Sequence, residues 1–439
     1  MVTITRVANA MQKVLGETAK RLGRECQFIQ RERKFTGATF AQTLVFGWLA
    51  NGEASLSEMS QAAAAVGLPV SEQAIDKRFT PEAVVFMEEL LQTTIAEIIS
   101  AKPVSMNIFN RFNGVYIRDS TVIGLPQSLS SVWLGCGDSK GETAALKVQV
   151  EWELSTGEFA DIALRPGREH DSQALQTSVE LPPGSLNIRD LGYFKLNQLE
   201  KEHNNGRFWL TRYKTKTILL DESGERLALD DWLKHLPKSV NRAERTVSMG
   251  ANHQIPCRLM VSRVSAMKAE ETRRKLKRAA QKRGDTVSKA RLALAEWFIY
   301  VTNVPPEQLS LDEALVLVRV RWQIELLFKL WKNEGQLDES RSENPWRILC
   351  EIYAKLIALV IQHWLVLVGC WGNAKRSLTK VAKTIRKFAF QLASTIMKAR
   401  QLRATIGNIR KCLASGCHIN TRKKQPNTYQ LLWNFENDA

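Results

Sequence analysis

The spacing of apolar residues along the chain changes twice, and each change predicts a different kind of region. Up to about Lys102 the pattern is helical, with an apolar stripe that includes Leu44, Phe46, Trp48 and Leu49. From about residue 114 the pattern of residues is typical of β-strands, and after Ser310 it is typical of helices again. The pattern therefore predicts a helical N-terminal region, a mixed α/β region and a helical C-terminal region.

Within the first region, two short helices meet at a glycine turn. A helix capped by Ser55 or Ser57 would run to Gly67, and Ser71 would cap a second helix that carries Lys77 and Arg78. Two short helices around a turn, with basic residues on the second, are typical of a helix-turn-helix. Lys77 and Arg78 are therefore candidates for DNA contact, and an ordinary helical hairpin is the alternative.

The central region alternates predicted strands with predicted helices. Helices are expected at residues 170–180 and 194–203, and strands at residues 114–126, 145–166 (two strands around a turn), 185–190, 207–220 and 296–305. This alternation is typical of an α/β fold. Residues 215–291 fit the alternation poorly, because they combine β-like segments with a basic run from Arg273 to Arg291, and this predicts a domain inserted into the α/β domain.

Composition adds a class of partner to this outline. The chain has 439 residues, 62 Lys and Arg against 45 Asp and Glu, a net charge of +17 and a pI of about 9.6. No acidic residue occurs between Glu351 and Glu436, a span that includes Arg422–Lys424. A long segment with charge of one sign repels itself, and phosphate groups would relieve that repulsion. Charge therefore favours a nucleic-acid partner.

The sequence argues against a membrane or secreted protein. The most apolar segment, residues 354–371, is interrupted by Lys355, Gln362 and His363, so a buried helix is expected rather than a membrane span. The first 20 residues contain no apolar signal-peptide core, and the seven scattered cysteines form no CxxC pair. A cytoplasmic protein is expected.

Two aspartates and one glutamate carry the candidate chemistry. Asp119 lies near the middle of an apolar strand, where a carboxylate is costly to bury unless it is paired or binds a metal. Asp190 lies where another strand meets a Leu-Gly turn, and strand ends present functional groups in α/β folds. The two could share a hard cation such as Mg²⁺, although a strand-edge Asp119 and a turn-forming Asp190 would fit the pattern equally well.

The predicted helix over residues 318–334 strengthens the metal interpretation. Arg321, Glu325 and Lys332 share one face of it, beside an apolar stripe. Arg321 and Glu325 could form a simple surface ion pair, worth only about 0.2–0.5 kcal/mol. Alternatively, Glu325 could bind a metal while the two cations hold phosphate oxygens. Glu334, Asp338, Glu339 and Glu343 could each replace Glu325, but they lack this framing by Arg and Lys.

At this helix the chain resembles a known family. RWQIELLFKLWK is similar to the signature helix of bacterial insertion-sequence DDE transposases of the insertion-sequence-four family, whose YREK signature is matched by Arg321, Glu325 and Lys332. The Tyr position is occupied by Val318. RDSTVIGLP resembles the first Asp motif of the family and RDLGYF the second, and FWLTR and WFIYVTNVP also agree. The resemblance extends from about Val115 to Lys332.

The resemblance implies a fold and a mechanism. It implies an RNase H-like core with Asp119, Asp190 and Glu325 as the DDE triad, binding two Mg²⁺ or Mn²⁺ ions. Arg321 and Lys332 would bind DNA phosphates, and Trp297 is a candidate for stacking a flipped base, with core packing as its alternative. The implied activity is cut-and-paste transposition, in which a homodimer acts on terminal inverted repeats and target DNA in a bacterial, nucleoid-associated setting.

The combined prediction is an α/β protein with an RNase H-like catalytic core, an inserted partly β domain and helical N- and C-terminal regions. The expected domains are a helical DNA-binding region (1–105), the first part of the core (106–213), the insert (214–292), the second part of the core with the Glu helix (293–372) and a basic helical region (373–439). Two alternatives stay open. One is a related nuclease without strand transfer, and the other is a non-catalytic DNA-binding protein derived from a transposase.

Overall fold

The computed structural model describes residues 2–31, 34–104, 106–137, 143–174, 180–373, 375–420 and 431–432. The basic residues Arg422–Lys424 lie outside the described part. The chain forms two compact units, which are described separately below. The first contains the described residues of Met1–Ser105, Asp119–Glu169 and Gln323–Gln425, and the second contains mainly those of Met106–Arg118 and His170–Trp322.

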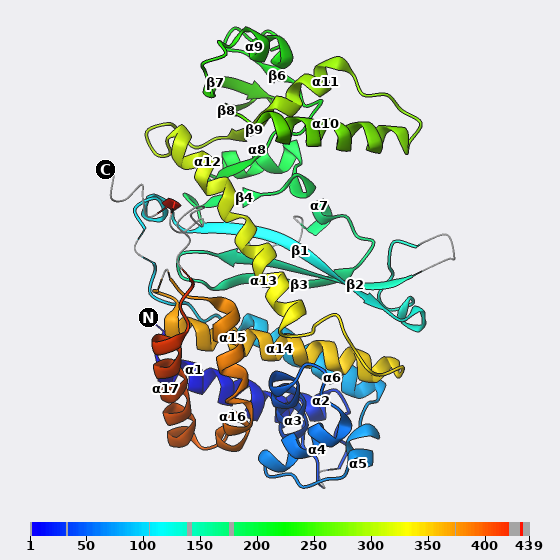
Figure 1. The fold of residues 1–439 in the computed structure, drawn as a ribbon. Helices are drawn as coiled ribbons and strands as arrows, with labels where there is room; N and C mark the ends of the chain where they lie inside the picture. Colours follow the sequence, from blue (N-terminus) through cyan, green and yellow to red (C-terminus); the bar gives the residue numbers. More distant parts are fainter. Residues whose placement is uncertain are drawn as a thin grey trace. The chain divides into compact units, whose positions relative to one another are not determined.

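The first unit is mostly helical (Figure 1). Its helices are α1 (Ile4–Gln12), α2 (Ala19–Glu25), α3 (Gly37–Ala50), α4 (Leu56–Ala65), α5 (Glu72–Asp76), α6 (Pro81–Ala96), α13 (Trp322–Asn333), α14 (Pro345–Cys370), α15 (Leu378–Arg386), α16 (Ala389–Thr395) and α17 (Ala399–Gly416). A π-helical segment, Lys13–Thr18, joins α1 to α2. The strands β2 (Ala144–Glu153) and β3 (Phe159–Pro166) complete this unit.

The second unit contains the remaining strands and helices. In chain order they are α7 (Asp171–Ala174), β4 (Leu186–Arg189), α8 (Leu196–Asn204), β5 (Phe208–Arg212), β6 (Leu219–Leu220), α9 (Leu229–His235), β7 (Arg242–Met249), β8 (Ile255–Arg263), α10 (Ala266–Gln281), α11 (Lys289–Ala293), β9 (Trp297–Thr302) and α12 (Leu311–Val320). The strand β1 (Val115–Leu125) contributes residues to both units.

The nine strands form one sheet in the order β3-β2-β1-β4-β5-β9-β8-β7-β6. β1 pairs with β4 and β4 with β5 in parallel, whereas β2 and β3 are antiparallel. β9 is antiparallel to both β5 and β8. The protein is therefore a mixed α/β protein, as the alternation of elements predicted.

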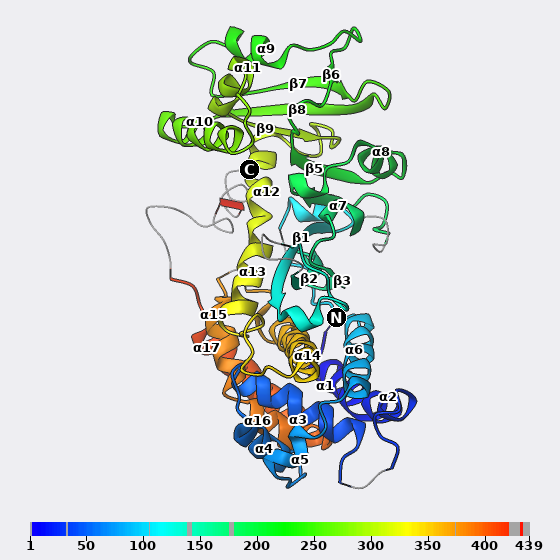
Figure 2. The ribbon, with the colours of Figure 1, turned by 90° about the vertical axis from the view of Figure 1, so that its right-hand side faces the viewer.

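Helix α14 forms the centre of the first unit, where it packs against α3, α6 and α17 (Figures 1 and 2). It is long and apolar enough to cross a membrane by composition, but 89% of its most apolar window is buried inside the protein. Burial of this apolar surface is a major stabilising contribution to the unit. The expectation of a buried core helix is met.

The turn between β2 and β3 is bonded to α14 through His363. Its Nε2 lies 2.5 Å from the carbonyl oxygen of Gly157, and its ring stacks on Phe159 at 4.1 Å. Gly157 has a φ of +75°, and a Cβ there would lie 2.4 Å from Trp371, so only glycine fits. Burial lowers the pKa of His363 from 6.5 to about 4, so the neutral imidazole donates its Nε2 hydrogen to Gly157.

This buried histidine predicts a pH-dependent stability of the first unit. Because the folded pKa is lowered, His363 contributes fully above pH 6.5, and its contribution is lost as the pH falls from 6.5 towards 4. Between pH 7.5 and 4.5 the loss should be about 2–3 kcal/mol. Urea denaturation at both pH values should show that His363→Gln reduces the wild-type pH dependence by this amount. His235 is exposed and lies in the second unit, so His235→Gln is the control and should keep the wild-type pH dependence of stability. If His363→Gln also kept the wild-type pH dependence, the buried neutral His363 would not be its source.

The predicted helix-turn-helix differs from the structure in its second helix. α4 begins at a capping box of Ser55 and Glu58, and Gly67 turns the chain with a φ of +88°. Helix α5, capped by Ser71, has only five residues and ends before Lys77. Lys77 and Arg78 therefore lie beyond a helix that is about 7.5 Å long. The guanidinium of Arg78 lies 5.0 Å above the Phe35 ring.

The core of the second unit lies against the outer strands of the sheet. Buried side chains from α8, α9 and strands β5 to β9 form one hydrophobic cluster, which includes Trp209, Met249, Leu259, Trp297 and Val301. The predicted strand over 207–220 is wrong as a single element. β5 ends at Arg212, the chain turns through Lys216 with a φ of +77°, and β6 contains only two residues.

The predicted helix over 318–334 is two helices. α12 ends at Val320 and α13 begins at Trp322. Arg321 keeps a right-handed helical backbone between them, with φ −49° and ψ −34°, so the chain continues in nearly helical register. Nothing in the local sequence, which lacks proline and glycine, explains the interruption.

Candidate active site

The two predicted aspartates follow paired residues on neighbouring parallel strands. In the second unit, β1 and β4 pair from Val115 with Leu186 to Arg118 with Arg189. Asp119 is the next residue of β1, and Asp190 directly follows the last residue of β4. Each aspartate therefore directly follows a residue of the last pair between these strands, Arg118 with Arg189.

Asp119 carries carboxylate oxygens of the kind that a hard cation prefers. The residue is half-buried on β1, and its Oδ1 accepts a hydrogen bond of 2.9 Å from the backbone N–H of Ser120. Carboxylate oxygens are the ligands that Mg²⁺ and Mn²⁺ prefer. Asp190 lies where β4 gives way to a 3-10 turn, Leu191–Tyr193, and its side chain is 40% exposed.

Within the first unit, Glu325 lies on a helix fixed to the strand of Asp119. The buried residues Ile324, Leu327, Phe328 and Trp331 form one side of α13, and the Trp331 ring meets Phe159 of β3 at 5.9 Å. Near its C-terminal end, Lys332 Nζ donates a hydrogen bond of 2.9 Å to the carbonyl oxygen of Val122 on β1. The packing of α13 and the Lys332 bond together anchor the glutamate helix against β1.

Lys332 therefore has a structural role. In addition to the Val122 carbonyl, its ammonium group lies 3.3 Å from the Asp338 carboxylate. The side chain is still 30% exposed. A contact between Lys332 and DNA phosphate stays a prediction.

The structure gives ion-pair partners to two of the four alternative third acids. Glu334 pairs with Lys383 at 3.4 Å and with Arg386 at 3.8 Å, and Asp338 pairs with Lys332. The backbone carbonyl of Glu339 accepts a hydrogen bond from the buried Lys355. The choice of Glu325 as the third carboxylate stays a prediction.

In the second unit, Asp190 lies in a cavity that is rich in arginine. Arg321 Nε is 4.0 Å from Asp190 Oδ1, so the first cation of the predicted signature lies beside the second predicted aspartate. The cavity has a volume of about 570 Å³. Its charged lining residues are Arg189, Asp190, Arg212, Arg242, Asp312, Arg319 and Arg321. Five arginines against two aspartates make it a site for anions.

Several bonds within the second unit fix the helix that lines this cavity. α12 starts at a capping box of Ser310 and Glu313. Both terminal nitrogens of Arg111 donate hydrogen bonds to the Glu313 carboxylate, at 2.9 and 2.8 Å. The buried Arg258 donates hydrogen bonds to the carbonyls of Val304 and Leu309, just before the helix. Val318, Arg319 and Arg321 are thereby held at the cavity wall.

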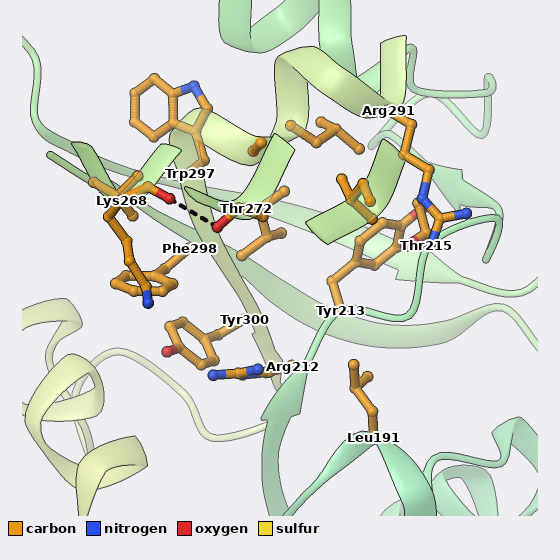
Figure 3. A pocket seen from close by; sticks show the side chains of 15 residues that line it. Leu191, Arg212, Tyr213, Thr215, Lys268, Thr272, Arg291, Trp297, Phe298 and Tyr300 are labelled. Atoms are coloured by element: carbon orange, nitrogen blue, oxygen red, sulfur yellow. Dashed lines mark hydrogen bonds between the residues drawn. The ribbon is translucent and has the colours of Figure 1, made fainter. Parts of the chain in front are cut away.

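Trp297 lies in the core of the second unit. Its ring is 7% exposed, belongs to the hydrophobic cluster and is covered on one face by Arg263 at 4.2 Å. It lines a neighbouring cavity of about 380 Å³ (Figure 3). Phe298, the next residue, lines both cavities and is 41% exposed. Base stacking by Trp297 stays a prediction, and its burial supports core packing.

Most residues of the arginine-rich cavity were not foreseen from the sequence, among them Arg212, Tyr300 and Arg319. Arg212 ends β5, Tyr300 lies on β9, and Arg319 is two residues before Arg321. The only available signal was that basic and aromatic residues occur at the ends of predicted strands, which is too common to be selective. Arg212 and Tyr300 lie side by side because β5 and β9 pair in antiparallel fashion, and no sequence pattern reveals that pairing.

Within the described ranges, no three side chains of His, Cys, Asp or Glu are grouped so that they could hold a metal ion. The predicted triad is divided between the units, with Asp119 and Glu325 in the first and Asp190 in the second. The metal site formed by the triad therefore stays a prediction, which the strand register and the oxygen-donor chemistry favour.

The arginine-rich cavity of the second unit suits a polyanion such as nucleic acid. Comparison with known proteins identifies the family. The family described as "Transposase DDE domain" matches residues 110–361, which is more than half of the chain. The chain belongs to this DDE transposase family, and it is an enzyme that cleaves and transfers DNA.

Curated relatives agree over most of their length. The transposase for insertion sequence element IS231C from Bacillus thuringiensis subsp. berliner is 30% identical over 372 residues, which cover 79% of this chain and 76% of the relative. The IS231B transposase from the same subspecies is 29% identical over 371 residues, or 79% and 76% of the two chains. The IS1151 transposase from Clostridium perfringens is 25% identical over 368 residues, or 79% and 77%.

Proposed function

We propose that this transposase performs cut-and-paste transposition with Asp119, Asp190 and Glu325 as its catalytic carboxylates. The observation that carries the proposal is the register of β1 and β4, in which the two aspartates follow the paired residues Arg118 and Arg189. The bond from Lys332 to Val122, which fixes the glutamate helix to β1, supports the third assignment.

The proposed fold is an RNase H-like core with an insertion. The strand order β3-β2-β1-β4-β5, antiparallel between β2 and β3 and parallel from β1 to β5, supports this core. β5 and β9 are adjacent and antiparallel, with Leu210 opposite Thr302, and strands β6 to β8 occupy the far end of the sheet. The residues between β5 and β9 are thus the proposed inserted domain. Assignment to the YREK subgroup rests on Arg321, Glu325 and Lys332.

Divalent-metal dependence is general in this family, and two Mg²⁺ or Mn²⁺ ions are proposed here. The oxygen donors of the three carboxylates suit these cations. Two bound ions would supply an activated nucleophile and stabilise the leaving oxygen of an in-line displacement. Arg321, beside Asp190, would hold a phosphate of the cleaved strand through a charge-assisted hydrogen bond. Lys332 would contact a DNA phosphate only through the exposed part of its side chain.

The remaining regions are proposed to bind DNA and a second subunit. α4 and α5, with Lys77 and Arg78, would contact the terminal inverted repeats, and the exposed basic residues of α17 would contact DNA or the second copy. A homodimer would hold two element ends together, as expected of an enzyme that joins them to one target. The proposed location is the bacterial cytoplasm, at the nucleoid.

The proposal is tested with DNA fragments that carry both ends of the element surrounding the gene. Purified protein with Mg²⁺ should cut these ends and, when a plasmid target is added, join them to it. Cleavage without joined products would support the nuclease alternative. Salt-sensitive binding without cleavage, in both Mg²⁺ and Mn²⁺, would support the non-catalytic alternative.

A further inference from the structure

Tyr300 occupies a distinctive position in the arginine-rich cavity. It lies on β9, paired with Arg212 of β5, and its side chain is only 8% exposed. The same cavity is lined by Val318, which lies three residues before Arg321 on α12. A phenol from the sheet and an aliphatic side chain from the helix therefore share one cavity wall with Asp190 and Arg321.

The charges in this cavity are unbalanced. Arg242 pairs with Asp312, and Arg321 pairs with Asp190. Arg212 and Arg319 are both exposed, and neither forms an ion pair with any residue in the described part of the chain. Two guanidinium groups are thus available for an anion that enters the cavity.

The phenol of Tyr300 is suited to donate a hydrogen bond to such an anion. Burial raises the pKa of Tyr300, and the nearby guanidinium groups of Arg212, Arg321 and Arg319 only partly oppose this, so the phenol keeps its proton at neutral pH. Figure 3 shows the Arg212 guanidinium beside the phenolic oxygen. Because arginine can only donate, a hydrogen bond from Arg212 leaves the phenolic hydrogen for another acceptor. Among the described residues, no acceptor for it is found.

We propose that Tyr300, with Arg212 and Arg319, binds a phosphate of the DNA strand that is cut beside Asp190. The phenolic hydroxyl donates to a non-bridging phosphate oxygen, and the two guanidinium groups neutralise its charge. Tyr300 on β9 thereby supplies the phenol that the helix lacks at Val318. This inference rests on the proposed function and extends it by a substrate-binding residue outside the signature helix.

The first test compares Tyr300→Phe with wild type in Mg²⁺-dependent cleavage of element ends. Tyr300→Phe keeps the ring and removes one hydrogen bond to a charged group, so cleavage should slow by about 10- to 100-fold. Tyr213→Phe is the matched control, because the Tyr213 hydroxyl donates to the Thr217 carbonyl at 2.5 Å in the same unit. It should retain the wild-type rate. Equal rates for Tyr300→Phe and wild type would overturn the inference.

The second test identifies the phosphate and needs no metal. Each phosphate within three nucleotides of the cut is replaced in turn by an uncharged methylphosphonate, and binding of the DNA is measured without Mg²⁺. At one position, replacement should weaken wild-type binding more than it weakens binding by Tyr300→Phe, which has already lost the phenolic hydrogen bond and keeps only the two arginine contacts. If Tyr300→Phe is as sensitive as wild type at every position, Tyr300 contacts no phosphate and the inference is wrong.

A rescue variant separates the phenol from the packing of the ring. Tyr300→Phe combined with Val318→Tyr places a phenol at another position in the lining of the same cavity. On a logarithmic scale, it should recover at least about half of the rate lost in Tyr300→Phe. Failure of wild type to cleave any end would count against the proposed function itself, whereas normal wild-type cleavage with no loss in Tyr300→Phe would count only against the inference.

Discussion

Replacing Glu325 with glutamine should abolish DNA cleavage and leave DNA binding within about twofold of wild type. Glutamine has nearly the same shape, so α13 keeps its buried face and its Lys332 bond to β1. What is lost is an anionic oxygen ligand. Loss of an outer-shell partner already costs 10- to 100-fold in metal enzymes, so loss of a direct ligand should cost about 10³-fold or more. Gel-based cleavage of end DNA with Mg²⁺, alongside binding of the same DNA, measures both effects.

Glu334→Gln is the matched control for this prediction. Glu334 follows α13 and pairs with Lys383 and Arg386, so its loss removes weak ion pairs within the first unit. Cleavage should stay within about twofold of wild type. Wild-type cleavage by Glu325→Gln, or a greater loss in Glu334→Gln, would show that the third carboxylate is misassigned.

Replacing Lys355 with methionine should destabilise the first unit by about 3–5 kcal/mol, the usual effect of removing one partner from a buried ion pair. The side chains of Lys355 and Glu351 are 1% and 5% exposed, and their charged groups lie 2.7 Å apart. Lys355 also donates to the carbonyls of Gln336 and Glu339, in the loop that follows α13. The variant therefore removes the lysine donor from two carbonyls and from the buried Glu351 carboxylate, which keeps its hydrogen bond from the Ser340 hydroxyl at 2.8 Å. Urea denaturation measures the loss.

The double variant Lys355→Met with Glu351→Met tests the cause of that loss. Replacing a buried ion pair by apolar residues is often neutral or stabilising. The double variant should therefore regain part of the stability lost by Lys355→Met, although the two carbonyls stay unsatisfied. A loss below about 1 kcal/mol in Lys355→Met would contradict the buried pair, because such a loss is typical of exposed pairs.

Much of the fold could be predicted from patterns that are local in sequence. A β-rich apolar segment predicted β1, and the Ser-Thr-Gly turn predicted β2 and β3, because each pattern depends on a single stretch of chain. The prediction failed where the chain turns without a strong signal. Lys216 turns the chain with a positive φ although it is not glycine, and Arg321 interrupts a helix without proline.

Some residues of the candidate site could likewise be predicted from the sequence, and others could not. The signature positions Arg321, Glu325 and Lys332 could be recognised because they are close in sequence and share helical spacing. Tyr300 and Arg212 are far apart in sequence and meet only because β9 pairs with β5 across an insertion. Lys332 was predicted to bind phosphate, and its bond to Val122 could not be foreseen because it depends on how α13 packs against β1.

The most direct test of the central claim is the binding of Mn²⁺ by the protein in complex with end DNA, measured by calorimetry on wild type and on Asp119→Asn, Asp190→Asn and Glu325→Gln. If the three carboxylates hold the ions together, wild type binds two ions and each variant loses at least one of them or binds it about 10-fold more weakly or worse, while DNA binding is retained. Wild-type Mn²⁺ binding by any one of the three variants would remove that carboxylate from the site and contradict the proposed triad.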